Sequence, residues 1–119
     1  MISYRFILAL LLSVNGQLLQ AQQPDTNAIK NLYDLSLDFT DDRVADLREN
    51  ADKIEVQSAK AEFTKGQLLA NRLRGLAEEY SGNYESAIGF YLQTLNDART
   101  GKWIEYEIAA LSDLAIANS

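Results

Sequence analysis

The sequence predicts an all-α protein made of antiparallel helix–turn–helix repeats. The first observation is a central pair of amphipathic segments, residues 67–81 and 84–99, whose apolar positions recur with helical spacing. The second is the short Ser-Gly-Asn turn that separates them. The third is a repeat of about 40 residues, which relates Gly75 to similar helical positions near Leu35 and Ala115. Helices joined by so few residues must lie antiparallel, so the repeated unit is expected to be a helical hairpin.

The central turn contains two residues suited to joining helices. Gly82 can adopt a positive φ at the end of the first helix without a steric cost. Asn83 is expected to cap the second helix, because its side chain can accept a hydrogen bond from a free backbone N–H.

Three further segments are predicted to be helices. The segment after Thr40 begins with the acidic pair Asp41-Asp42, which is favourable in a first helical turn. The last segment follows Gly101, which is expected to end the central hairpin with a positive φ. The sequence therefore predicts about five helices. We expect one pair at residues 28–39 and 42–60, a second pair at 67–81 and 84–99, and an unpaired helix at 103–118.

The first 22 residues are a different kind of sequence. Arg5 is their only charge, residues 6–14 form an apolar run, and Ala21 offers a small residue for cleavage. This pattern predicts a secretory signal peptide at residues 1–22, cut after Ala21 or a residue or so later. The apolar run is too short for a comfortable transmembrane helix. A polar linker at residues 23–27 would then lead into a helical domain at 28–119, exported to the periplasm or secreted from a bacterial cell.

Composition excludes several classes of function. With 119 residues, 47% hydrophobic and 24% charged, the chain is long enough for one small globular domain. Its net charge of −6 argues against nucleic-acid binding, which needs a basic patch. It has no Cys and no His, which removes thiol nucleophiles, Cys or His zinc sites and the His base of a serine triad. We therefore expect no catalytic residues, no cofactor and no metal.

The acidic pairs do not change this expectation. Glu78-Glu79 and Asp41-Asp42 are interpreted as solvated helix faces and caps, since nothing places two carboxylates across a cleft for glycoside hydrolysis. The acidic residues from Asp38 to Asp46 lack the alternating spacing and glycine turn of a calcium loop.

The central hairpin resembles a tetratricopeptide repeat. The run Gly82-Asn83-Tyr84-Glu85-Ser86-Ala87-Ile88 is similar to the Gly-Asp-Tyr-x-x-Ala-hydrophobic core of that family's motif. The matching positions are Gly75, Gly82, Tyr84, Ala87, Ile88, Tyr91 and Leu95. The chain departs from the family at Asn71, Glu78 and Thr94, where Trp, Tyr and Ala are common, and no proline closes the repeat. The resemblance covers roughly residues 28–118 and implies an α-solenoid. The period of about 40 residues resembles that of exported sensor regions of bacterial signalling proteins.

The resemblance also implies a binding surface. Tetratricopeptide repeats use their first helices to line a groove for peptides. When the groove positions of the family are carried over to this sequence one by one, the residues implied to line the groove are Leu69, Arg72, Leu76 and Glu79. Leu69 and Leu76 also belong to the apolar stripe expected in the core, so Arg72 and Glu79 are the better groove candidates. Plain surface is nevertheless the favoured interpretation of Arg72 and Glu79. The aromatic residues are mostly expected to pack between helices, although they could instead form a ligand-stacking surface: Tyr80, Tyr84, Phe90, Tyr91 and Trp103.

We therefore expect an exported scaffold that binds a protein or peptide and performs no catalysis. The alternative is the sensor portion of a signalling protein, such as a sensor histidine kinase or a transcription regulator, whose effector domain would lie beyond residue 119. The helix from Trp103 to Asn118 is apolar on more than one side, so it is expected to cap the array or to pair with further repeats or another copy. Neither nucleic acid nor a membrane span in the mature chain is expected.

Overall fold

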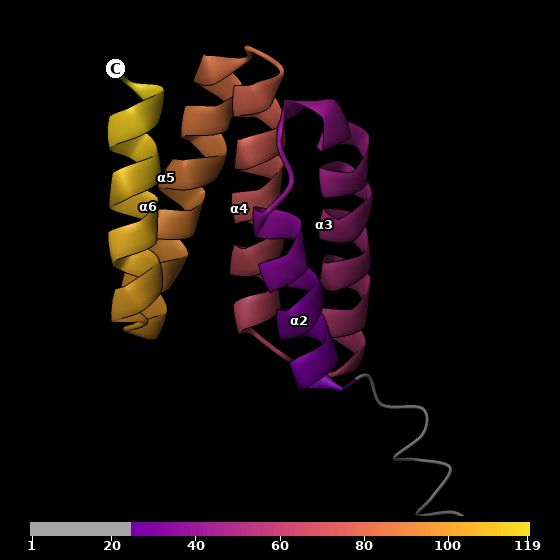
Figure 1. Cartoon of the computed structure of the whole chain (residues 1–119). Helices are drawn as coiled ribbons and strands as arrows, with labels where there is room; N and C mark the ends of the chain where they lie inside the picture. Colours follow the sequence, from indigo (N-terminus) through magenta and orange to yellow (C-terminus); the bar gives the residue numbers. More distant parts are fainter. Residues whose placement is uncertain (1–24) are drawn as a thin grey trace, which may run out of the picture.

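The computed structural model describes residues 25–119, and over this part the chain is all-α (Figure 1). The described part contains one short 3₁₀ turn, η1, and five α-helices. Their bounds are α2 Thr26–Leu37, η1 Asp41–Arg43, α3 Val44–Lys60, α4 Lys65–Tyr80, α5 Tyr84–Gly101 and α6 Ile104–Ala117. The predicted all-α class and the five helices are thus confirmed. The predicted signal peptide at residues 1–22 lies outside the described residues.

The helices pack in chain order as in a helical repeat. Each of α3, α4, α5 and α6 contacts the helix before it, and α2 contacts both α3 and α4. Figure 1 shows α3, α4, α5 and α6 side by side, with α2 in front of α3 and α4. The first helices of the pairs, α2, α4 and α6, therefore form one layer, and α3 and α5 form the other.

The core lies where α2, α3 and α4 meet. It excludes water from aliphatic side chains of all three helices, which is the main stabilising contribution to so small a domain. Ala70 and Ala77 of α4 are fully buried, and their small side chains let the neighbouring helices approach α4 closely. The buried members of this core are Ile29, Tyr33, Phe39, Leu47, Ala51, Ile54, Leu68, Leu69, Ala70, Leu73, Ala77 and Ala98.

The α4–α5 turn confirms one expectation and corrects another. Gly82 has φ +82°, the conformation expected of it. Asn83 precedes α5, but its side chain makes no capping hydrogen bond to that helix. Its amide nitrogen instead donates to the Glu78 carboxylate at 2.9 Å, so Asn83 ties the turn back to α4. The prediction of a side-chain cap was wrong, because the hydrogen bond to the Glu78 carboxylate holds the Asn83 side chain toward α4.

The end of α5 also differs from expectation. Gly101 is the last residue of the helix, and Lys102 takes the left-handed conformation with φ 59°. A Cβ on Gly101 would lie 2.7 Å from the Trp103 ring, so this glycine is required for close packing and not for a positive φ. At the other end of the domain Asp25 caps α2, and its carboxylate accepts a hydrogen bond from the backbone N–H of Asn27 at 2.9 Å.

The last helix, α6, is covered on one side only. Its Ala110 is fully buried and Asp113 nearly so. Its opposite face exposes large apolar side chains, namely Ile104, Ile108, Leu111 and Ile116. The expectation that this helix pairs with further repeats or with another copy stays a prediction.

Candidate functional site

The α2–α4–α6 layer is held together by a polar network at its centre. Arg72 of α4 donates to both carboxylate oxygens of Asp113 on α6, at 2.8 and 3.2 Å. It also donates to the Tyr33 hydroxyl of α2 at 2.7 Å. These residues stand 39 and 41 positions apart in the sequence, close to the repeat length of the chain. The network therefore joins equivalent regions of the alternate helices α2, α4 and α6.

This network is largely shielded from solvent. The side chains of Arg72 and Asp113 are 18% and 9% exposed. Burial disfavours the charged guanidinium, but the hydrogen bonds that Arg72 donates to Asp113 and Tyr33 outweigh this effect and raise the pKa of Arg72 above its usual value. Arg72 is therefore a fixed, neutralised cation, and it is not available to a ligand without breaking a bidentate pair.

One end of the layer is filled by aromatic side chains. The rings of Tyr33 and Tyr106 pack edge to face with centroids 6.4 Å apart. The ammonium group of Lys65 lies 5.4 Å from the ring centroids of both Trp103 and Tyr106. These contacts close the layer near the start of α4 and α6.

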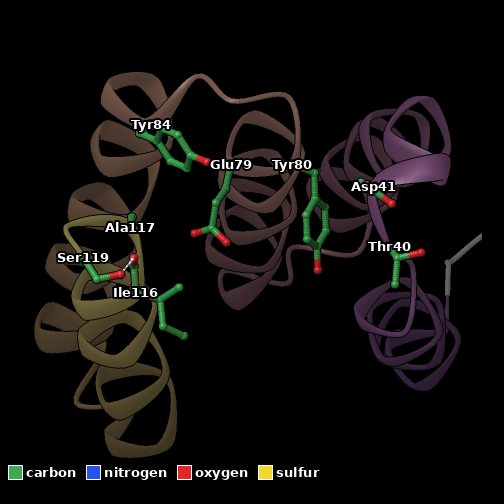
Figure 2. Close-up of a pocket in the computed structure, with 8 residues that line it drawn as sticks. All are labelled: Thr40, Asp41, Glu79, Tyr80, Tyr84, Ile116, Ala117 and Ser119. Atoms are coloured by element: carbon green, nitrogen blue, oxygen red, sulfur yellow. Dashed lines mark hydrogen bonds between the residues drawn. The ribbon is translucent and has the colours of Figure 1, made fainter.

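The other end of the layer is open and forms a pocket of about 750 Å³. Glu79 and Tyr80 stand at the end of α4, about two helical turns beyond Arg72. Figure 2 shows them between Thr40 and Asp41 on one side and Ile116 and Ser119 on the other. The complete lining is Thr40, Asp41, Glu79, Tyr80, Tyr84, Ile116, Ala117 and Ser119.

The charge of the pocket is negative. Asp41 and Glu79 line it, and neither forms an ion pair within residues 25–119. Glu79 accepts a hydrogen bond from the Tyr91 hydroxyl at 3.2 Å. Burial of Tyr91, together with the negative charge of Glu79, raises the pKa of that hydroxyl, so it remains a donor at neutral pH.

The four residues suggested for a groove lie in different places. Glu79 lines the pocket, and Arg72 lies in the buried network. Leu69 is fully buried in the core, and Leu76 is half-buried against it, as their apolar spacing indicated. Only Glu79 of the four therefore stands where a ligand could meet it.

The pocket also contains residues that the sequence did not suggest as a group. Tyr80 and Tyr84 were expected to pack between helices, but they are 37% and 55% exposed, so for them that prediction was wrong. Both flank the turn at the end of a helix, where there is no neighbouring helix to cover them. Tyr91, by contrast, is fully buried as predicted.

The acidic side chains and the helices of the described part of the chain also bear on metal binding and on membrane spanning. Among residues 25–119, no group of acidic side chains is arranged to hold a metal ion, and no helix is long and apolar enough to cross a membrane. Comparisons with protein-family models, with characterised proteins and with solved structures found no match.

Proposed function

We propose that the protein is an exported, tetratricopeptide-like scaffold that binds a short extended peptide segment of another protein in the pocket at the open end of the α2–α4–α6 layer. The observation that carries the proposal is the pocket itself. It is the hollow end of a layer whose centre and opposite end are filled by the Arg72 network and by packed aromatic rings.

The size and lining of the pocket support a peptide ligand. A volume of about 750 Å³ is in the range of sites that take small ligands and side chains. Its exposed phenol rings can contact a ligand over a large area at little entropic cost, because each ring has few rotatable bonds. Its walls come from several different helix ends, as in repeat proteins whose ligand contacts more than one repeat.

The proposal assigns no chemistry to this pocket. Thr40 and Ser119 are hydroxyl-bearing residues in the lining, but no Lys, His or Cys lines it beside them to activate a nucleophile. The lining can therefore position a ligand, and binding is the role that we propose.

Selection from a display library of short random peptides on the immobilised full chain tests this proposal. We expect recovered peptides to bind the Tyr80→Ala/Tyr84→Ala variant at least about tenfold more weakly, because aromatic anchors carry much of the energy of peptide recognition. The matched control is Val56→Ala/Leu92→Ala, which removes two side chains that are also half exposed but lie on α3 and α5 outside the pocket. Failure to recover any binding peptide, or equal binding by the pocket variant, would contradict the proposal.

Export is the part of the proposal that rests on the sequence of residues 1–22. Expression of the full chain in a bacterial host should place a protein that begins close to residue 22 in the periplasmic fraction, as intact mass will show. Leu10→Arg interrupts the apolar run and should leave the unprocessed chain inside the cell. Recovery of the full-length mass from wild-type periplasm, or of uncleaved protein only in the cytoplasm, would contradict export by a cleaved signal peptide.

A further inference from the structure

We infer that the pocket selects a basic side chain, lysine or arginine, in the bound peptide. The inference rests on the proposed function and specifies the chemistry of the partner. Its basis is the juxtaposition of two carboxylates and two phenol rings around one open pocket.

The carboxylates have no cation to neutralise them. Asp41 and Glu79 come from different elements, η1 and α4, and no Lys or Arg lines the pocket with them. Each of these carboxylates attracts a cation to the pocket and disfavours an acidic ligand.

The cations of the neighbouring segments are already engaged. Arg72 is held by Asp113 and Tyr33. Arg43 pairs with Asp46 at 2.9 Å and lies over the Phe39 ring. Arg48 donates to Glu78 and to Ser81. None of these three needs a partner in the pocket, so Asp41 and Glu79 remain free to pair with a ligand.

The phenol rings extend the preference from charge to side-chain shape. Tyr80 and Tyr84 are exposed in the pocket lining and can hold a guanidinium or ammonium group over a ring face. Ile116 is 60% exposed in the opposite wall and offers an apolar contact for the aliphatic stem of the same residue. An arginine or lysine side chain is complementary to each of these groups, since it carries a cation on an aliphatic stem.

The test uses the peptides recovered by selection from the random display library. We expect lysine and arginine to be enriched in them relative to the starting library. We also expect Asp41→Asn/Glu79→Gln to weaken their binding about five- to tenfold at low salt, since each exposed charge pair contributes up to about 1 kcal/mol. The matched control, Glu49→Gln/Glu105→Gln, removes the same charge from exposed positions on α3 and α6 that do not line the pocket, and should leave binding unchanged.

The outcomes separate this inference from the proposed function. Peptides that are not enriched in basic residues, or that bind the Asp41→Asn/Glu79→Gln variant as tightly as wild type, would overturn the charge preference while leaving peptide binding intact. An equal loss of binding by the Glu49→Gln/Glu105→Gln control would also overturn it, because the effect would then come from net charge alone. Absence of any recovered peptide would overturn both proposals.

Discussion

Gly75 and Gly89 lie in neighbouring helices, but only the first is required by packing. A Cβ built on Gly75 would lie 2.5 and 2.7 Å from two carbons of the Tyr91 ring, which is fully buried. A Cβ on Gly89 would meet nothing within 4 Å. Gly75 therefore allows α4 and α5 to approach each other, whereas Gly89 only weakens its helix.

The two glycines give a matched pair of substitutions. Gly75→Ala should lower the free energy of unfolding by about 1–3 kcal/mol, because the Tyr91 ring must move in a close-packed interior. Gly89→Ala should raise it by about 0.5–1 kcal/mol, since alanine loses less backbone entropy in a helix. Urea denaturation followed by circular dichroism measures both. A neutral Gly75→Ala would mean that α4 and α5 are further apart than described.

Among the polar side chains, Arg72 is the one whose removal should lower the free energy of unfolding most. Arg72→Leu leaves the Asp113 carboxylate and the Tyr33 hydroxyl buried without their donor, and should cost about 3 kcal/mol of unfolding free energy. Arg72→Leu/Asp113→Leu should recover much of that loss, because the uncompensated charge is then gone. Lys53→Leu, which breaks an exposed pair with Glu49, should cost less than about 1 kcal/mol. The result that would contradict a buried pair is a double variant no more stable than Arg72→Leu alone.

Helix α6 has two faces with opposite environments. Ala110 is fully buried, and Ile108 is 63% exposed on the same helix. Exposed apolar rows of this kind mark surfaces that meet partners more often than they stabilise the domain that bears them. The stability of the domain should therefore depend on one face of α6 and not on the other.

Two substitutions in α6 test that division. Ala110→Asp buries a carboxylate without a partner and should lower the free energy of unfolding by at least about 3 kcal/mol. Ile108→Lys should change it by less than about 0.5 kcal/mol, as expected for an exposed site. Urea titrations at several protein concentrations measure both effects. A large, concentration-dependent cost of Ile108→Lys would show that another copy covers this face in solution.

At the scale of elements, periodicity predicted the helices well and their ends less well. The helices follow apolar spacing that only a helix converts into one buried face, so their existence and order were predictable. The helix ends depend on local hydrogen bonds and backbone conformations that compete with one another. Asn83 donates to Glu78 where a helix cap was expected, and Lys102 has the left-handed conformation that was expected at Gly101.

The candidate site was predictable only in part, because it forms between segments that are distant in sequence. Glu79 could be inferred from its place on a first helix. Asp41 and Ile116 could not, since nothing in their local sequence shows that their helix ends lie beside α4. The spacings of Arg72 from Tyr33 and from Asp113, 39 and 41 residues, are the long-range signal that the repeat period contained.

The whole molecule should respond to alkaline pH through its buried tyrosines. Burial raises the pKa of Tyr33, Tyr91 and Tyr106 in the folded state. In the unfolded chain these phenols ionise near pH 10. Their contribution to stability is therefore complete below pH about 10 and is lost as the pH rises above that value.

We expect the free energy of unfolding to fall above pH about 10, by up to about 1.4 kcal/mol per pH unit for each such tyrosine. Tyr91→Phe removes one titrating group and should make the fall less steep. Urea titrations between pH 8 and 11 measure the slopes. Identical slopes for wild type and Tyr91→Phe would contradict a buried, protonated Tyr91.

The Arg72 network has a consequence for how a ligand enters. Because one guanidinium holds α2 and α6 against α4, both walls of the pocket are attached to its floor before any ligand arrives. The distance between the walls is then a property of the free protein, and a ligand need not order them when it binds. Association should accordingly be fast and entropically inexpensive, because the conformational cost of assembling the site is met during folding.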